Sequence, residues 1–214
     1  MSSFAALTTP LRRLTLAAAF VVTVSASATA SADSGAVAFV QKLGDTAIAD
    51  LTDPKLSDSA RVKRMRTLLA NAFDVVAVSR FVLGPYMRRT TPEQFKDFTH
   101  LYEIYVAHNY AGLFKRYNGE KVEMQSERDI PGGDIAVYGI IKQEDGPSIN
   151  IAMRVRKENG GYKAVDLKVE GVSMPLTHRK QFASVIAQHN GQVSGLIDAL
   201  RAADNRFEKE APSQ

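Results

Sequence analysis

The sequence predicts an α+β fold: a curved antiparallel sheet of four strands, or slightly more, with helices packed over one face. Apolar residues recur at helical spacing up to about residue 117, alternate with polar residues between about 121 and 170, and then return to helical spacing. Separate runs of helices and strands are typical of α+β proteins. The 214 residues contain no internal repeat and no low-complexity linker, which indicates one domain behind an N-terminal leader.

The N-terminus has the pattern of a secretory signal peptide over residues 1–32. Arg12 and Arg13 precede an apolar run at 14–24, and A-x-A sites follow up to Ala32. The run is shorter than the roughly 20 residues that span a bilayer, which disfavours an uncleaved anchor. A twin-arginine signal is the other alternative, but the flanking residues match it poorly. We therefore expect cleavage near Ala32 and export of the chain.

Four helical segments are predicted before the strands. Their apolar periodicity covers residues 34–51, 58–73, 74–83 and 91–117. The last segment begins with Thr91-Pro92-Glu93-Gln94, which combines a capping residue, a proline at the first helical position and a glutamine three residues after the cap. This combination marks the start of the longest helix.

Four strands are predicted between residues 121 and 170. Alternating apolar residues cover 121–127, 134–143, 148–158 and 162–170, and turns rich in glycine separate these segments. The alternation leaves one apolar and one wet face, as in an antiparallel meander. Two helices are predicted afterwards, at about 178–189 and 191–203. The predicted domain therefore spans 33–204, and we expect the charged tail at 205–214 to be flexible.

The composition argues against several kinds of chemistry. The chain has no cysteine, so we expect no disulfide, zinc–cysteine site or thiol catalysis. His100 and His108 are eight residues apart, which does not match the i, i+4 pair of a helical zinc site. The glycines around Ser194 lack the G-x-S-x-G spacing of a serine hydrolase. The formal charge of +4 without a basic and aromatic stripe does not indicate nucleic-acid binding. We predict no enzymatic activity, no cofactor, no metal and no nucleic-acid partner.

Two groups of basic residues are candidates for contact with an anionic partner. The run at 61–66 is interpreted as a solvated helix face, and a docking patch is the alternative. Arg88 and Arg89 lie at the end of a predicted loop, where a pocket mouth is expected. Guanidinium groups there would suit a phosphate headgroup.

Large apolar side chains are expected to face inward from both layers. We expect a stripe on the long helix to oppose the apolar face of the sheet. The stripe contains Phe98, Tyr102, Tyr105, Val106 and Phe114, and the sheet face contains Met124, Val137, Ile151, Met153 and Leu167. A packed core and an apolar ligand cavity use the same residue types, so the pattern alone leaves both interpretations open.

Several segments, in order, resemble the MlaC family, also called the toluene-tolerance family. Residues 74–86 (DVVAVSRFVLGPY) resemble the segment before the family's long helix. Further similar segments are 91–98 and 105–117 on the tyrosine-bearing helix, then 169–174, 179–182 and 191–200 (GQVSGLIDAL). The resemblance covers nearly all of the chain after the predicted leader.

The resemblance implies a periplasmic carrier that binds a phospholipid in an apolar cavity, and we expect a monomer. Our hypothesis is that the helices at 74–83 and 91–117 close over the sheet, with the acyl chains between them. Such carriers exchange lipid between an outer-membrane lipoprotein complex and an inner-membrane ABC transporter with a substrate-capturing domain. Arg88, Arg89 and Arg179 are the expected headgroup contacts at the rim. The expected cavity lining consists of Phe81, Val82, Tyr86, Phe98, Tyr102, Tyr105, Val106, Phe114, Met124, Val137, Ile151, Met153, Leu167, Val169 and Met174.

Several alternatives remain at the level of sequence. Members of the family often have Asn-Tyr before the arginine at Arg179, whereas this chain has Leu176-Thr177-His178. A related branch, HpnM, is associated with hopanoids, so a hopanoid is the alternative ligand. An envelope adaptor with a filled core, a small lyase or isomerase, and a polar-solute binding module are the other classes considered. The inward positions contain no acid or histidine, which disfavours the enzyme.

Overall fold

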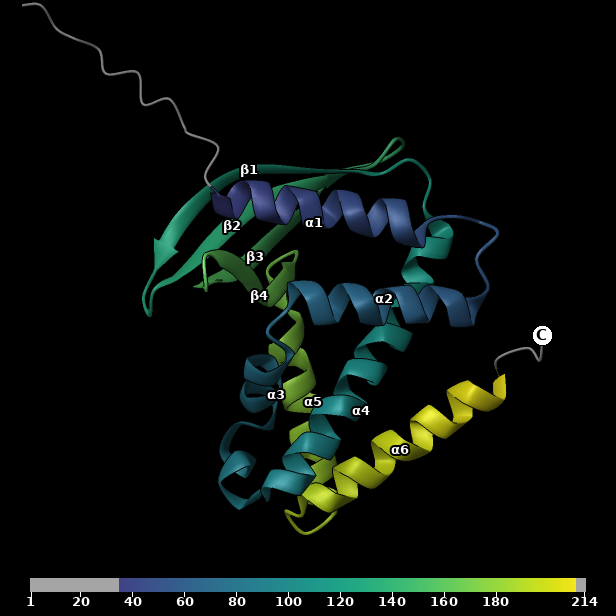
Figure 1. Cartoon of the computed structure of the whole chain (residues 1–214), viewed down its shortest axis with the longest axis vertical. Coiled ribbons are helices and arrows are strands. Elements are labelled where there is room, and N and C mark those ends of the chain that lie inside the picture. The colour runs from purple at the N-terminus through teal and green to yellow at the C-terminus, as the bar shows by residue number, and fades with distance from the viewer. Residues whose placement is uncertain (1–34, 211–214) are drawn as a thin grey trace, which may run out of the picture. The chain divides into compact units, whose positions relative to one another are not determined.

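The computed structural model describes residues 35–210, and the predicted signal peptide at 1–32 lies outside the described residues. Helices precede and follow the sheet, in the order predicted (Figure 1). The elements before the sheet are α1 (Gly35–Leu51), α2 (Asp58–Ala72), α3 (Val75–Leu83), the 3-10 helix η1 (Gly84–Arg89), α4 (Pro92–Ala111) and the 3-10 helix η2 (Gly112–Arg116). After the sheet come α5 (Met174–Gln188) and α6 (Val193–Glu210).

The strands form a five-stranded antiparallel sheet in the order β1-β2-β3-β4-β5. The strands are β1 (Lys121–Ile130), β2 (Asp134–Lys142), β3 (Ile149–Glu158), β4 (Gly161–Val169) and β5 (Val172–Ser173). Each strand pairs with the next one along the chain, which is the meander that the alternating pattern predicts. The α+β prediction is therefore confirmed, with β5 as an additional short strand.

Helix α1 covers one face of the sheet over β1 and β2 (Figure 1). Gly44 permits the close approach, because a Cβ at this position would lie 2.9 Å from Val122 Cγ1. The Gln41 side chain fastens the same helix to β1: it donates to the Val122 carbonyl oxygen at 2.9 Å and accepts from the Met124 N–H at 2.9 Å. Sequence periodicity identified this helix but not its place on the sheet.

Phe73 and Asp74 connect the helices to the edge of β4. Phe73 forms a parallel bridge with Ala164, and the Asp74 N–H donates to the Ala164 carbonyl oxygen at 3.0 Å. The Asp74 carboxylate caps α3 by accepting from the Ala77 N–H at 2.8 Å. Arg156 of β3 lies 3.9 Å from the same carboxylate. The junction between α2 and α3 is therefore held to the sheet.

The apolar core of the described residues is divided into three clusters. The helical cluster joins α3, α4, α5 and α6 and contains Val78, Val82, Leu83, Phe98, Leu101, Tyr102, Phe182, Ile186, Val193, Leu196, Ile197 and Leu200. The sheet cluster joins α1 to the strands and contains Ala36, Val40, Val137, Met153, Val155 and Ala164. The α2–α4 cluster contains Leu51, Met65, Leu69, Ala107 and Ala111.

This division shows that the expected packing of Phe98 and Tyr102 against the sheet is wrong. Phe98 and Tyr102 pack in the helical cluster, and Phe114 packs against the α2–α4 cluster. Val137 and Met153 belong to the cluster that α1 covers. The stripe on α4 is broad, so it contacts several helices, and periodicity reports which residues share a face but not what lies against that face.

Several predicted boundaries differ from the structure. The helix predicted at 178–189 begins at Met174, because Ser173 caps it by accepting from the Leu176 N–H at 3.2 Å. The helix predicted at 91–117 changes to a 3-10 helix at Gly112. The last helix runs past Asp204 to Glu210, so it is longer than predicted.

Candidate functional site

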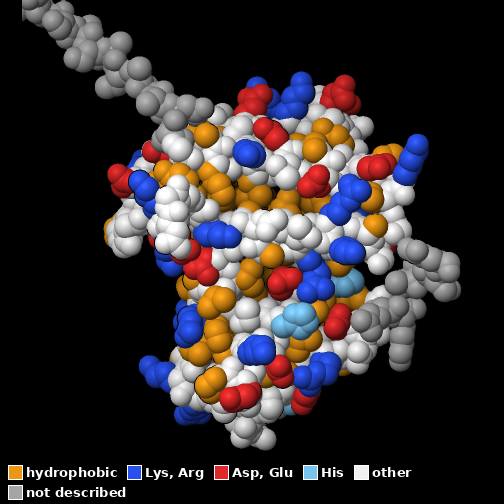
Figure 2. All heavy atoms as spheres, viewed as in Figure 1, with side chains coloured by type: hydrophobic (Ala, Val, Ile, Leu, Met, Phe, Trp, Pro, Cys, Tyr) orange, Lys and Arg blue, Asp and Glu red, His pale blue; other side chains and the backbone are white. Residues whose placement is uncertain are grey.

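A recess with hydrophobic side chains lies between α1 and α2 (Figure 2). The connection between the two helices closes one end of it. There the Arg61 guanidinium is buried and donates to the carbonyl oxygens of Leu51, of Asp53 at 3.1 Å and of Leu56 at 3.3 Å. These bonds satisfy carbonyl groups at the C-terminus of α1, where a cation is favourable.

The start of β4 closes the other end of the recess. A Cβ at Gly35, the first residue of α1, would lie 3.1 Å from the Tyr162 ring. Lys163 Nζ donates to the Asn71 carbonyl oxygen near the end of α2 at 2.6 Å. The recess is therefore framed by α1, α2, their connection and β4.

Partly buried hydrophobic side chains from two clusters meet at Phe73, which packs against both of them. We call this set the apolar band. Its sheet side consists of Val37, Phe39, Leu43, Met124, Ile135, Tyr162 and Leu167, and its helix side of Ala47, Val62, Leu68, Val106, Tyr110 and Phe114. Side chains that are neither fully packed nor fully solvated offer apolar contact area to a ligand.

The structure divides the predicted cavity-lining residues among several places. Val106, Phe114, Met124 and Leu167 lie in the apolar band, whereas Val137 and Met153 are buried in the sheet cluster. Ile151, Val169 and Met174 are half-buried. Val82, Phe98 and Tyr102 are buried in the helical cluster, with Tyr86 and Tyr105 packed against it, and Phe81 is exposed.

A buried polar network connects α4 to α5 beside the apolar band. His178 hydrogen-bonds through both ring nitrogens: Nδ1 lies 2.9 Å from the Tyr102 hydroxyl oxygen and Nε2 lies 3.0 Å from that of Tyr110. The Tyr105 ring meets the imidazole edge-on, with centroids 5.6 Å apart, and Phe182 stacks on it. His178 is only 5% exposed. The spacing of the histidines in the sequence did not indicate this pairing.

Burial determines the protonation states of the three groups in the network. It lowers the pKa of His178 to about 4, because the charged imidazolium is poorly solvated there. It raises the pKa of Tyr102 and, together with the neighbouring Tyr105, that of Tyr110. All three groups are therefore neutral near pH 7, and the network acts through hydrogen bonds.

The predicted rim arginines lie at the far end of the helical part of the molecule. Arg88 and Arg89 are exposed on η1, and a Cβ at Gly191 in the α5–α6 turn would lie 3.7 Å from Arg89 Nη1. The Arg179 guanidinium lies over the Phe81 ring at 5.2 Å. A Cβ at Gly84, where α3 ends and η1 begins, would lie 2.7 Å from Arg179 Nε, so the three arginines lie near this end of α3. This end of α3 is away from the sheet (Figure 1).

The basic run at 61–66 is occupied with contacts inside the fold. Arg61 is buried at the end of α1, and Arg64 donates to the Asp50 carbonyl oxygen at 2.9 Å. Arg66 pairs with Glu103 of α4 at 3.0 Å. These bonds favour a structural role for the run. The prediction of a solvated helix face is wrong for Arg61, which is buried.

A second apolar hollow of about 340 Å³ lies between α4, α5 and α6. It is lined by Tyr105, Phe182, Val185, Leu196, Ala199 and Leu200, among others. This volume is at the low end of the roughly 300–1,000 Å³ of small-molecule sites. It is a competing location for an apolar ligand.

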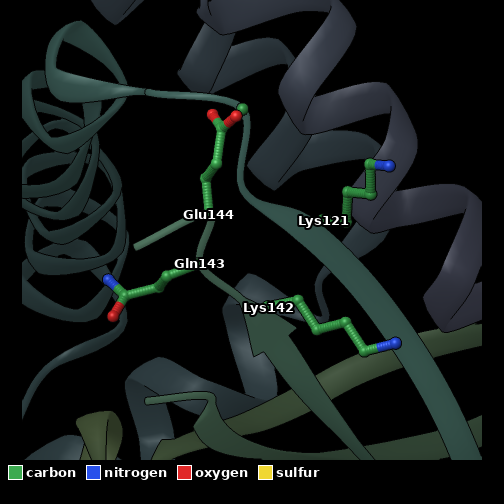
Figure 3. Close-up of a pocket in the computed structure, with 5 residues that line it drawn as sticks. Lys121, Lys142, Gln143 and Glu144 are labelled. Carbon is green, nitrogen blue, oxygen red and sulfur yellow. The ribbon is translucent and has the colours of Figure 1, made fainter. Parts of the chain in front are cut away.

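A polar hollow of about 340 Å³ lies where β2 ends, near the start of β1 (Figure 3). The labelled side chains of Lys121, Lys142, Gln143 and Glu144 point in different directions and do not converge on one point. Lys142 is paired with Glu123 at 2.7 Å. Nothing in this arrangement resembles a catalytic set.

Residues 35–210 contain no group of three or more histidine, cysteine or acidic side chains placed to hold a metal ion. Within the same range, none of the helices is long and apolar enough to cross a membrane. Beside the apolar band, the polar groups that the described structure brings together are two tyrosines and His178.

The fold and the apolar band define a class of small α+β proteins with an open apolar recess between a helix-covered sheet and a group of helices. The family model described as MlaC protein matches residues 41–202, and this chain therefore belongs to the MlaC family. The resemblance noted in the sequence is confirmed.

This chain is also similar to a curated protein and to a solved structure. The toluene tolerance protein ttg2D of Pseudomonas putida is 24% identical over 164 residues, which are 72% of this chain and 76% of that protein. A phospholipid-binding protein from Ralstonia solanacearum, solved in complex with a phospholipid, shares the fold with a TM-score of 0.70. That similarity covers 81% of this chain and 98% of the other at 23% identity.

Proposed function

We propose that this chain is a periplasmic carrier that binds a phospholipid with its acyl chains against the apolar band. The observation that carries the proposal is the meeting of two half-buried apolar surfaces at Phe73, one from the sheet and one from α2 and α4. Membership of the MlaC family and a fold shared with a phospholipid-binding protein support it. Binding, rather than catalysis, is the role of the site.

The energetics of lipid transfer explain why a carrier needs such a surface. Two acyl chains expose about 30 methylene groups, and at about 0.8 kcal/mol each their passage through water would cost on the order of 20 kcal/mol. An apolar recess lowers this barrier, because its side chains replace the contacts that the acyl chains make in the bilayer. The free energy of the lipid in the carrier must stay close to its free energy in the membrane, because a ligand held much more tightly would not be delivered.

The residues that we propose as acyl-chain contacts lie on both sides of Phe73. On the sheet side they are Met124 and Leu167, continued by the half-buried Ile151 and Val169. On the helix side they are Val106, Tyr110 and Phe114. Val137 and Met153 share this face of the sheet with Leu167, which is paired directly with Met153, and they are buried in the cluster that α1 covers.

The proposed route of the ligand runs between an outer-membrane lipoprotein complex and an inner-membrane ABC transporter. Removal of residues 1–32 as a signal peptide and release into the periplasm are part of the same proposal. Arg88, Arg89 and Arg179 are exposed or half-buried at the end of α3. Because they lie away from the band, we propose that they meet anionic surfaces of a partner more readily than the bound headgroup.

Native mass spectrometry of the mature protein, purified without detergent and followed by solvent extraction, tests the function. We expect a stoichiometric phospholipid. A hopanoid in its place would assign the chain to the hopanoid-associated branch. A ligand-free mass, with no uptake from labelled vesicles, would favour an envelope adaptor and contradict the carrier.

Substitution in the band tests the location in the same experiment. We expect Leu167→Asp to lower lipid occupancy at least about tenfold, because a carboxylate against acyl chains is poorly solvated. Leu113→Asp is the matched control, since Leu113 is 52% exposed and lies outside the band. Equal occupancy in the two folded variants would contradict the assignment.

A further inference from the structure

The hydroxyl protons of the Tyr102–His178–Tyr110 network have one arrangement that satisfies the buried groups. A neutral imidazole carries a proton on one nitrogen and accepts on the other. Tyr102 is 4% exposed, and within residues 35–210 its hydroxyl contacts His178 Nδ1 alone. The Tyr102 O–H must therefore donate to Nδ1, because otherwise its proton would be buried without an acceptor.

This assignment determines the rest of the network. Since Nδ1 accepts, the ring proton is on Nε2, and the Nε2–H donates to the Tyr110 hydroxyl oxygen over 3.0 Å. The Tyr110 hydroxyl then keeps its own proton for an acceptor outside the network. In the reverse arrangement, the Tyr102 hydroxyl proton would be buried without an acceptor. This is less favourable than leaving the hydroxyl proton of the half-buried Tyr110 without an acceptor in the network.

Tyr110 connects the network to the apolar band, because the residue belongs to the band and its hydroxyl reaches His178 of α5. Its side chain packs against the α2–α4 cluster together with Phe114 and Val106, and Phe73 links that cluster to the sheet cluster. An occupant of the band would displace water from the hydroxyl. An occupant without an acceptor would leave the donor unpaired, whereas one with an acceptor would replace the lost bond.

We propose that the Tyr110 hydroxyl donates a hydrogen bond to an ester carbonyl oxygen of the bound lipid, and that Tyr102 and His178 position it. Ester carbonyls are the acceptors next to the acyl chains, so they are the first polar groups to reach a donor beside an apolar wall. The inference rests on the proposed lipid-carrier function and adds a preference for acyl esters over ethers.

The direct test compares two short-chain lipids that differ at the carbonyls. The probes are dihexanoyl phosphatidylcholine and its dihexyl diether analogue, titrated below their aggregation limits into delipidated mature protein. The diether is the more apolar compound, so burial alone favours it. We expect the wild type to bind the diester about tenfold more tightly, and Tyr110→Phe to bind both with similar affinity.

Tyr105→Phe is the matched control, because Tyr105 touches His178 through its ring edge and lies on the same helix. It should keep the diester preference. A preference that survives in Tyr110→Phe, or that Tyr105→Phe abolishes equally, would overturn the assignment. If Tyr110→Phe does not fold, the wild type decides: equal binding of the two lipids overturns the inference. Failure of both lipids to bind contradicts the carrier function itself.

Discussion

At the scale of the residue, His178 connects α5 to α4 and hydrogen-bonds Tyr110 of the apolar band. Its two ring nitrogens join tyrosines that lie on the same helix, and Phe182 stacks on the ring. The ring is buried, so the positive charge that protonation creates lacks the solvation that it would have in water. The same feature that orients Tyr110 therefore makes the fold sensitive to acid.

We expect the free energy of unfolding to fall as pH falls from 6.5 toward 4. The pKa of His178 is about 4 in the folded chain and 6.5 ordinarily, so in this interval the unfolded chain binds a proton that the folded chain does not. The contribution of His178 to the free energy of unfolding is therefore largest above pH 6.5, and about 2 kcal/mol is lost by pH 5. Urea unfolding at pH 7 and pH 5 measures the difference.

His178→Gln separates this contribution from those of carboxylates. The variant lacks the titrating group, so its stability should change less between pH 7 and pH 5, even though it is less stable than the wild type at pH 7. An identical pH dependence in both proteins would show that His178 is not the group responsible.

Individual residues were harder to assign from sequence than the elements that carry them. His178 stands alone in the sequence, and its partners Tyr102 and Tyr110 are 76 and 68 residues away. Phe73 was interpreted as one more apolar residue of a helix, but it pairs with Ala164 and joins two clusters. Such roles depend on tertiary placement, which spacing along the chain does not report.

At the scale of the element, local chemistry predicted several boundaries well. The capping box at Thr91 is present in full, because Thr91 Oγ1 accepts from the Gln94 N–H at 3.2 Å and the Gln94 side chain accepts from the Thr91 N–H at 3.1 Å. The start of α5 was missed although Ser173 and Pro175 carry a similar signal. That cap directly follows β5, so the residues were assigned to a loop after the sheet.

The contact between α1 and β1 depends on Gly44, and we expect Gly44→Ala to destabilise the protein by about 1 kcal/mol. Helix propensity alone favours alanine by about 1 kcal/mol. The added methyl group would lie 2.9 Å from Val122 Cγ1, and a β-branched side chain has little freedom to move away. Chemical unfolding measures the change.

Two further variants isolate the cause. In a Val122→Ala background, the Gly44 substitution should lose most of its cost, because the Cγ1 contact is removed and only the Cβ contact at 3.2 Å is left. Gly112→Ala should be neutral or stabilising, since no atom lies within 4 Å of the place its added methyl group would take and its φ of −63° is helical. Stabilisation by Gly44→Ala similar to that by Gly112→Ala would contradict the close approach.

At the scale of the whole molecule, the α+β class and the order of helices and strands were predictable, and the pairing of the layers was not. Alternation along β2 and β3 correctly predicted a sheet with one apolar face. Nothing in the periodicity distinguished α1 from α4 as the cover of that face. The consequence is a divided core, whose half-buried surfaces meet at Phe73 instead of forming one packed layer.

This division also separates two possible locations for an apolar ligand. The apolar band lies between the sheet and the α2–α4 cluster, and the hollow lined by Val185, Leu196 and Leu200 lies among the helices. A lipid carrier needs surface that is available without unfolding the core. The band meets this requirement with side chains that are only partly buried.

The most direct test is to locate the acyl chains by intermolecular NOEs between a protonated phospholipid and methyl groups of the deuterated protein. We expect NOEs from chain methylenes to Leu167, Ile151 and Met124, and none to Leu196 or Leu200. NOEs confined to Leu196 and Leu200 would place the ligand in the hollow between the helices. That result, or the absence of any NOE to bound lipid, would contradict a carrier that holds its ligand against the apolar band.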